Sequence, residues 1–497
     1  MSIWQKVRYQ VEFAFAATSL ALTVGCTTPN TLAQTFAESS QKSPAPNSET
    51  ALIFLVDGLS VDALVRARTN RVTPNVDNFF QLAARPQLAP AQVDSGHHGF
   101  QLARASFPSL TYPNIVSILT GESVGRHGIS GNHLAIQGGS TLDFEDFRSW
   151  DELNERIREQ TIFHELTRRH LSSVSLSYPF SRGATAHLET NLPVGFNYAN
   201  QDYSEIDKQT LLALEQVLEL TSKERWPRFI FVHLIAVDAF EHLYGPNDPR
   251  IQDSIQLMDE RLKATFQLLS NASAEGHKVR AVLTADHGFT SITHQIDISA
   301  ISKRIRSDDN FVADNRMASI FLSSRSADHA LSLAHSLESV PHLEWIIRRT
   351  KTGLELKRRS GESALIESRP GACALTKTRF RFTWRDGVST AARDGVSTSP
   401  VTDADFFCAE SFDKASTTDN LNFIVPALTE FFSLANPPDI ILVADDHSDF
   451  AGGYLGNHGG LTRGEMLVPL LTRGLDNANQ DDGIQPTWGL LRLLQLK

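Results

Sequence analysis

The sequence predicts an α/β protein whose central layer is a mostly parallel β-sheet with helices on both faces. Short apolar runs that end at an acidic residue alternate with longer stretches of helical periodicity. Parallel strands are covered on both faces, so they read as continuous apolar runs rather than as alternating ones. Their alternation with helices indicates a three-layer sandwich. With 497 residues, of which 41% are hydrophobic and 21% charged, the chain can bury a core of that size.

Four apolar runs are the predicted strands of this sheet, and helices are predicted between them. The runs cover 51–56, 229–237, 279–285 and 440–444, and they are followed by Asp57, Asp238, Asp286 and Asp445. Helical periodicity is clearest over 204–220 and 251–269. Because ligands bind beyond the carboxyl ends of parallel strands, we expect acids at these positions to share one edge of the sheet.

The rhythm of strands and helices is interrupted once, which divides the folded part of the chain. The alternation of strands and helices covers 51–297 and resumes over 434–497. These two segments are predicted to form the catalytic core. The segment 298–433 between them has its own short apolar patterns and is predicted to be an inserted cap subdomain. Residues 27–50 are rich in Thr, Ser, Pro, Asn and Gln, the composition of a flexible linker.

Residues 1–26 have the composition of an export signal. Lys6 and Arg8 precede an uncharged apolar stretch that ends at Gly25, and this stretch is too short to span a bilayer comfortably. A small residue directly before Cys26 is typical of a bacterial lipoprotein signal peptide. We therefore expect an exported periplasmic or cell-envelope protein that is attached to the membrane through a lipidated Cys26. Ordinary cleavage and an uncleaved apolar segment are the alternatives.

Lipidation of Cys26 would leave Cys373 and Cys408 as an even pair of cysteines. A disulfide between them can persist in an oxidising compartment. Two unpaired buried thiols are the alternative, and spacing alone does not decide between them.

The charge of the chain bears on its partners. A formal net charge of −11 argues against a general nucleic-acid binder, because affinity for a phosphate backbone normally needs a basic surface. We expect a small-molecule substrate instead.

Six carboxylate and imidazole side chains give the strongest functional signal. Such groups are the usual non-thiolate ligands of zinc, and six of them divide naturally between two ions. One Asp-His pair occurs easily by chance in a capped loop, but several such groups near predicted strand ends are hard to explain by structure alone. The six are Asp57, Asp238, His242, Asp286, His287 and His458. We therefore predict two divalent metal ions, and Zn²⁺ suits these ligands best.

Thr111 is the predicted nucleophile. It stands two residues before Pro113, a residue favoured in the first turn of a helix, and an apolar run follows. A hydroxyl at a helix N-terminus can bind a metal that lowers its pKa, while the helix dipole favours the charge of a phosphate. The alternative is a simple N-cap, and the metal-ligating set favours the nucleophile.

With these motifs the chain resembles the type I phosphodiesterase/nucleotide pyrophosphatase branch of the alkaline phosphatase superfamily, through most of 51–297 and again over 439–474. The resemblance implies that Thr111, which is separated from a Pro-Asn pair only by Tyr112, is the nucleophile rather than Ser106 or Ser109. It also implies how the metals are held: one by Asp238, His242 and His458, and the other by Asp57, Asp286, His287 and a bridging Thr111.

The same resemblance implies contacts with the substrate. Asn132 would donate a hydrogen bond to a phosphoryl oxygen, and a neutral donor suits a singly charged diester. Arg182 lies in a segment faintly similar to one of the monoesterases, but Phe180 stands where their lysine would be. Substrate contact and a surface ion pair therefore stay open for Arg182. Tyr112 could pack against a leaving group or form a wall of the site.

The implied activity is two-metal hydrolysis of a small phosphate ester through a phosphothreonine intermediate, with a phosphodiesterase or nucleotide pyrophosphatase as the first choice. A sulfatase would need an arginine where Ile115 stands, and a phosphoglycerate mutase would need a domain inserted after the nucleophile. A phosphomonoesterase or phosphonate hydrolase is the alternative. An inactive envelope scaffold is a minor one, and a multi-span group transferase is disfavoured.

One further residue and one further segment are predicted to have structural roles. His233 lies inside a predicted strand and is expected to belong to the core. The segment 461–466, which follows His458, is expected to close the site through packing and an ion pair.

Overall fold

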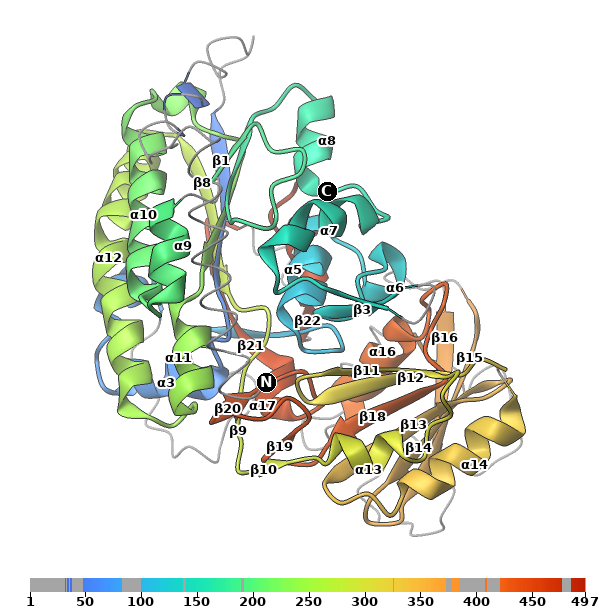
Figure 1. Cartoon of the computed structure of the whole chain (residues 1–497). Coiled ribbons are helices and arrows are strands. Elements are labelled where there is room, and N and C mark those ends of the chain that lie inside the picture. Colours follow the sequence, from blue (N-terminus) through green and yellow to red (C-terminus); the bar gives the residue numbers. More distant parts are fainter. Residues whose placement is uncertain are drawn as a thin grey trace.

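The computed structural model describes residues 32, 34, 36–37, 48–82, 100–136, 140–188, 192–324, 326–371, 378–384, 407–408, 421–475 and 484–496. Within these residues the predicted fold class is confirmed: a central, mostly parallel sheet lies between two layers of helices (Figure 1). The predicted signal peptide 1–26 with Cys26, most of the predicted linker 27–50, and Cys373 lie outside the described residues.

The central sheet has eight strands, and most of its parallel strands lie in one uninterrupted run. In spatial order they are β22 (Gln485–Pro486), β2 (Gln101–Arg104), β21 (Leu467–Arg473), β8 (Lys278–Thr284), β1 (Glu49–Val56), β7 (Phe229–Leu234), β5 (Ser173–Leu176) and β6 (Ala186–His187). The five strands from β8 to β6 pair in parallel, whereas β21 is antiparallel to both of its neighbours. Since β1 lies between β7 and β8, the residues that follow these three strands meet at one edge.

Helices cover both faces of this sheet (Figure 1). One face carries α3 (Val61–Thr69), α9 (Leu192–Ala199), α10 (Tyr203–Glu219), α11 (Ala236–Tyr244) and α12 (Pro249–Ala274), and the other α5 (Thr111–Thr120), α7 (Trp150–Arg156) and α8 (Ile162–Arg168). The helices predicted over 204–220 and 251–269 are α10 and α12. The second begins earlier than predicted because Pro249 suits a first turn and the carboxylate of Asp248 caps the backbone N–H of Arg250.

A second sheet, also of eight strands, is antiparallel throughout. Its order is β11 (Asn310–Asp314), β12 (Met317–Phe321), β18 (Ile440–Ala444), β13 (Leu343–Arg349), β14 (Gly353–Arg358), β15 (Ser363–Pro370), β16 (Thr378–Trp384) and β17 (Phe407–Cys408). Seven of these strands come from the segment that was predicted to be an inserted cap, and β18 comes from beyond its predicted end at 433.

The prediction that 440–444 forms a parallel strand of the central sheet is wrong. The segment is a strand, β18, but it pairs antiparallel with β12 and β13 in the second sheet. Its side chains alternate between two cores: Ile441 and Val443 belong to the large core, and Ile440 and Leu442 to a smaller one beneath α14 (Ala327–Leu337). A strand buried on both faces reads as a continuous apolar run in either kind of sheet.

The described helices include none that combines the length and the apolar character needed to cross a bilayer.

Candidate active site

The carboxyl ends of β1, β7 and β8 gather the six predicted metal ligands at one edge of the central sheet. Asp57 directly follows β1, and Asp286 and His287 follow β8. Asp238 and His242 lie one turn apart on α11, which follows β7, so both side chains leave the same face of that helix. His458 comes from the loop after β20 (Gly456–Asn457).

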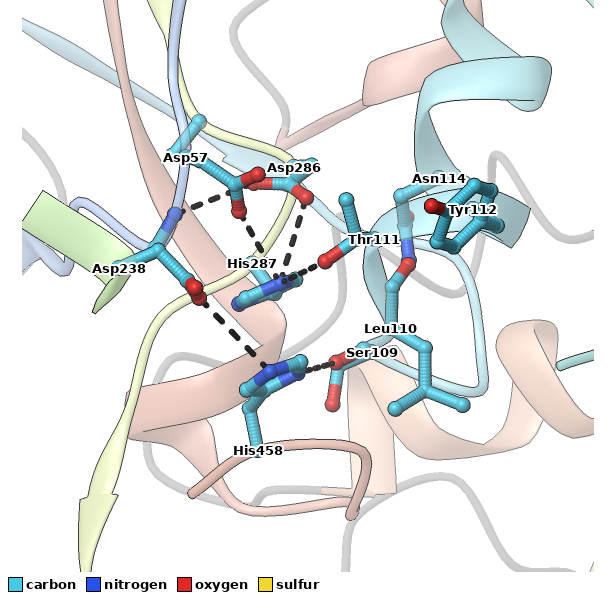
Figure 2. A network of polar contacts seen from close by, with 12 residues as sticks. Asp57, Ser109, Leu110, Thr111, Tyr112, Asn114, Asp238, Asp286, His287 and His458 are labelled. Atoms are coloured by element: carbon cyan, nitrogen blue, oxygen red, sulfur yellow. Dashed lines mark hydrogen bonds and ion pairs between the residues drawn. The ribbon is translucent and has the colours of Figure 1, made fainter. Parts of the chain in front are cut away.

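The six side chains form two groups, and the division matches the predicted one. In the first group, Nε2 of His242 and of His458 lie 3.7 and 3.8 Å from Oδ1 of Asp238. The second group consists of Asp57, Asp286 and His287, with Nε2 of His287 3.5 and 3.2 Å from carboxylate oxygens of the two acids (Figure 2). The rings of His287 and His458 stack at 3.6 Å, so the groups are immediate neighbours.

Each imidazole is held by a backbone carbonyl that accepts from its Nδ1. His242 donates to Gly456 at 3.0 Å, His458 to Ser109 at 2.9 Å, and His287 to the next residue in the chain at 3.3 Å. Burial lowers the pKa of His458 to about 3 and that of His287 well below its usual range, so these rings are neutral. This arrangement leaves the Nε2 lone pairs facing the site, as in metal-bound histidines, whose other ring nitrogen usually donates to a carbonyl or carboxylate.

Few hydrogen bonds offset the burial of the carboxylates of the site. Burial raises the pKa of Asp57 to about 7, and burial together with the neighbouring acids raises the pKa of Asp238 and of Asp286 well above the usual range. One oxygen of each is buried without a hydrogen bond: Oδ1 of Asp57, Oδ1 of Asp238 and Oδ2 of Asp286. Three acids so placed are costly unless cations neutralise them, so the site fits divalent metal ions.

Thr111 is the first residue of α5, as predicted, and its hydroxyl faces the second group. Oγ1 lies 3.1 Å from Nε2 of His287 (Figure 2). Leu110 precedes the helix in extended conformation, and the turn before it is braced by Asn114, whose side chain accepts from Ser106 N at 2.6 Å and donates to the carbonyls of Pro108 and Leu110. Asn114, for which the sequence alone predicted no role, thus fixes the position of Thr111.

Asn132 and Tyr112 lie beside the nucleophile. Asn132 is buried, and its Oδ1 accepts from the backbone N–H of Tyr112 at 3.2 Å. The Tyr112 side chain is buried between Phe144 and Phe180, and its hydroxyl accepts from the indole of Trp150 at 3.2 Å. Tyr112 therefore forms part of a wall, whereas Asn132 is held at the N-terminus of α5.

Arg182 does not join this group in the structure. Its side chain is exposed and donates to the backbone carbonyl of Asn154, and it lines a small cavity with Val116 and Leu119. These two residues belong to the middle and the end of α5, away from Thr111. Contact between Arg182 and a substrate stays a prediction.

His233 has a role beyond the core position expected from sequence. Nε2 donates to Oδ2 of Asp57 at 2.8 Å, and Nδ1 accepts from the hydroxyl of Ser177 at 3.2 Å. Burial lowers the pKa of His233 to about 4, which keeps the ring neutral in this orientation. Its position on β7, directly beside β1, brings it to Asp57, and only strand pairing reveals that proximity.

Replacing His233 with alanine is therefore expected to weaken metal binding by roughly 10- to 100-fold, the usual cost of losing such an outer-shell partner. Calorimetric titration of metal-free protein with Zn²⁺ measures this. The matched control is His277→Ala, because His277 bonds Thr50 near the opposite end of the sheet and should leave the affinity unchanged. Equal affinities in the two variants would show that Asp57 does not depend on His233.

The loop that carries His458 is held by a buried ion pair. Arg316, between β11 and β12, pairs with Glu465, and both side chains are fully buried. The backbone N–H of Arg316 donates to the carbonyl of His458, while Glu465 accepts from Gly460 N at 2.9 Å. The expected ion pair after His458 thus has its partner in the second sheet, which couples that sheet to the site.

Comparison with known proteins places the chain among phosphoesterases. A family model described as type I phosphodiesterase / nucleotide pyrophosphatase matches residues 51–358. An uncharacterised pyrophosphatase/phosphodiesterase of Schizosaccharomyces pombe is 23% identical over 270 residues, which are 51% of this chain and 49% of that protein. The match thus spans about half the length of this relative.

Solved structures agree on the fold. Phosphonoacetate hydrolase of Sinorhizobium meliloti superposes with a TM-score of 0.54 at 14% identity, covering 91% of this chain and 97% of that one. Murine ectonucleotide pyrophosphatase/phosphodiesterase 5 also gives 0.54, at 15% identity over 90% and 96% of the two chains. At such identities the likeness concerns the alkaline phosphatase-like fold alone.

Proposed function

The chain belongs to the type I phosphodiesterase/nucleotide pyrophosphatase family, and from this premise we propose that it hydrolyses phosphodiesters through a phosphothreonine formed at Thr111. The observation that carries the proposal is the hydroxyl of Thr111, which lies at a helix N-terminus 3.1 Å from Nε2 of His287, in a site where three carboxylates each keep one buried oxygen without a hydrogen bond. A phosphoryl group placed there meets the helix dipole and a reactive hydroxyl together.

The metal ions belong to the proposal. Asp238, His242 and His458 would hold one Zn²⁺, and Asp57, Asp286, His287 and Thr111 the other. Bound there, the ions would neutralise phosphoryl charge and lower the pKa of the attacking hydroxyl.

The reaction has two steps, formation of the phosphothreonine and its hydrolysis, and residues of the chain take part in them. Oγ1 of Thr111 bonds to phosphorus as the ester oxygen leaves, and a water molecule later attacks the phosphothreonine and restores the hydroxyl. Asn132 is positioned by the Tyr112 N–H so that its amide can donate to a non-bridging oxygen as charge develops there.

A diester is favoured over a monoester because the described surroundings of Thr111 offer no cationic side chain for a second negative charge. Arg182, the residue that could have served, donates to the backbone carbonyl of Asn154 on α7 and lies beside Val116 and Leu119 of α5, away from Thr111. Dianionic phosphate is bound best by charged donors. Export and attachment through a lipidated Cys26 complete the proposal, and they rest on the sequence of residues 1–26 alone.

The test is to compare bis-p-nitrophenyl phosphate, p-nitrophenyl phosphate and phosphonoacetate on one zinc-loaded preparation. We expect kcat/KM for the diester to exceed that for the monoester by at least about tenfold, since an unmet charge costs more than about 1.4 kcal/mol. A chelator should abolish turnover, and Zn²⁺ should restore it. Preference for the monoester or for phosphonoacetate would replace the phosphodiesterase assignment with the corresponding hydrolase.

A further inference from the structure

The helix that carries two of the predicted metal ligands is capped by a residue from another helix. α11 bears Asp238 and His242, but its N-cap position is occupied by Ile235, whose side chain cannot accept a hydrogen bond. The first backbone N–H groups of a helix have no acceptor within the helix. Here Oδ1 of Asp207 accepts from Ile235 N at 2.7 Å, and Oδ2 accepts from Ala236 N at 3.2 Å. The carboxylate of Asp207 therefore supplies the cap that the sequence of α11 itself lacks.

Asp207 is held in this position by the packing of the fold. It lies on α10, on the same face of the central sheet as α11 (Figure 1), and only 5% of it is exposed. Burial raises the pKa of Asp207 to about 7, while the N–H groups that it accepts favour the charged form. Above neutral pH the carboxylate is thus charged, and a negative charge stabilises a helix N-terminus.

The capped junction between β7 and α11 separates the two groups of ligands. On the strand side, His233 holds Asp57 of the second group, and the pairing of β7 with β1 and β5 fixes this part of the chain. On the helix side, the ring of His242 is tied to the carbonyl of Gly456. The first turn of α11, which contains Asp238, lies beyond the strand pairing and before that tie. Asp207 therefore acts on Asp238 in particular.

We propose that Asp207 is a positioning residue for the first group of ligands: by capping α11, it holds the carboxylate of Asp238 in place for the ion that this group would bind. The inference rests on the two ions of the proposed function and adds a residue on which only one of them depends. Without the cap, binding of the ion must also order the first turn of α11, so the affinity falls. The second group follows β1 and β8 and does not depend on this turn.

A second buried aspartate makes the same kind of cap and provides the matched control. Asp259, on α12, accepts from the backbone N–H groups of Asn75 at 3.2 Å and Val76 at 2.8 Å, at the start of α4 (Pro74–Phe79). It is fully buried, and Thr73, the N-cap residue of α4, makes no side-chain cap. Since α4 carries none of the predicted ligands, Asp259→Ala removes an equivalent cap without acting on either ion.

The test is calorimetric titration of metal-free protein with Zn²⁺ at pH 8, in two backgrounds that each disable one group of ligands. Asp57→Asn disables the second group, and in this background Asp207→Ala should weaken the remaining site roughly tenfold, the scale of a lost helix cap. His242→Ala disables the first group, and in this background Asp207→Ala should leave the affinity unchanged. Asp259→Ala should leave it unchanged in both.

A conservative variant and the parent background add two further readouts. Asp207→Asn keeps one accepting oxygen and removes the charge, so with Asp57→Asn it should weaken binding only about threefold, the scale of one charge at a helix N-terminus. In the parent background, Asp207→Ala should lose diester hydrolysis at limiting Zn²⁺ and regain it when Zn²⁺ is in excess. Asp259→Ala should need no such excess.

The outcomes separate this inference from the function on which it rests. An unchanged affinity of the first group in Asp207→Ala, or an equal loss at both groups, would overturn the inference while the two-ion function stands. If the alanine variant does not fold, Asp207→Asn decides, and an unchanged affinity of the first group in that variant would overturn the inference. A parent protein that binds no Zn²⁺ would overturn both, whereas one that binds two ions and hydrolyses no phosphodiester would overturn the function alone.

Discussion

Replacing Thr111 with alanine is expected to lower kcat for diester hydrolysis by at least about a thousandfold, the scale seen when a covalent nucleophile is removed. The loss should fall on kcat, because the three acids and three histidines that would bind the ions remain in place. Steady-state kinetics with bis-p-nitrophenyl phosphate measures it, and titration with Zn²⁺ verifies that the variant still binds metal.

The matched variant is Thr111→Ser, which keeps a hydroxyl at the first position of α5 and should retain activity. The side chain of Thr111 is half-buried, so neither substitution should unfold the protein. Substantial activity in the alanine variant would mean that water attacks phosphorus directly and that no phosphothreonine forms. Trapping of a phosphorylated peptide containing Thr111 from the active protein would argue for the covalent route.

In the metal-free protein, stability is expected to fall as pH rises through neutrality. Burial raises the pKa of Asp57 from 3.8 to about 7, so the folded metal-free protein binds a proton that the unfolded chain has released. The stability from that proton is fully present below the unfolded pKa and is lost as pH rises through the folded one. Asp238 and Asp286 act in the same direction, since burial raises their pKa values too.

The window for this measurement follows from the histidines. Burial lowers the pKa of His458 to about 3, which opposes the carboxylate effect below the ordinary histidine value of 6.5. Between pH 6.5 and 8 Asp57 by itself should lower stability by about 1 kcal/mol, and subtracting the change seen in metal-free Asp57→Asn removes the contribution of the histidines, which also titrate there. Addition of Zn²⁺ at pH 8 to a concentration a thousandfold above its Kd should restore about 4 kcal/mol.

Chemical denaturation of chelator-treated protein at the two pH values measures the effect. In metal-free Asp57→Asn the buried charge is absent, so this variant should exceed the metal-free parent in stability at pH 8 and gain less from Zn²⁺. If the stability of metal-free Asp57→Asn changes between pH 6.5 and pH 8 by as much as that of the metal-free parent, Asp57 carries no buried charge that a cation must neutralise.

The sequence by itself determined the fold class and the chemical composition of the site. Apolar runs that end in acids identified β1 and β8, and parallel strands bring their carboxyl ends to one edge, so the positions of Asp57 and Asp286 followed from order along the chain. The run predicted over 229–237 identified β7, but the strand ends at Leu234, and Asp238 lies on α11 instead of directly after a strand. Thr111 was likewise placed at a helix start by Pro113 and the apolar run behind it. These features are local, and local pattern encodes them.

Only the tertiary structure decided which distant segments meet. The apolar run of β18 fits any strand buried on both faces, and its partners β12 and β13 put it in the second sheet. The contacts of His233 with Asp57, of Arg316 with Glu465 and of Asp207 with Ile235 arise between elements whose proximity no periodicity encodes. The residue types at strand ends indicate which chemistry the site can perform. The orientation and charge of the site depend on side chains from distant segments, which only packing brings together.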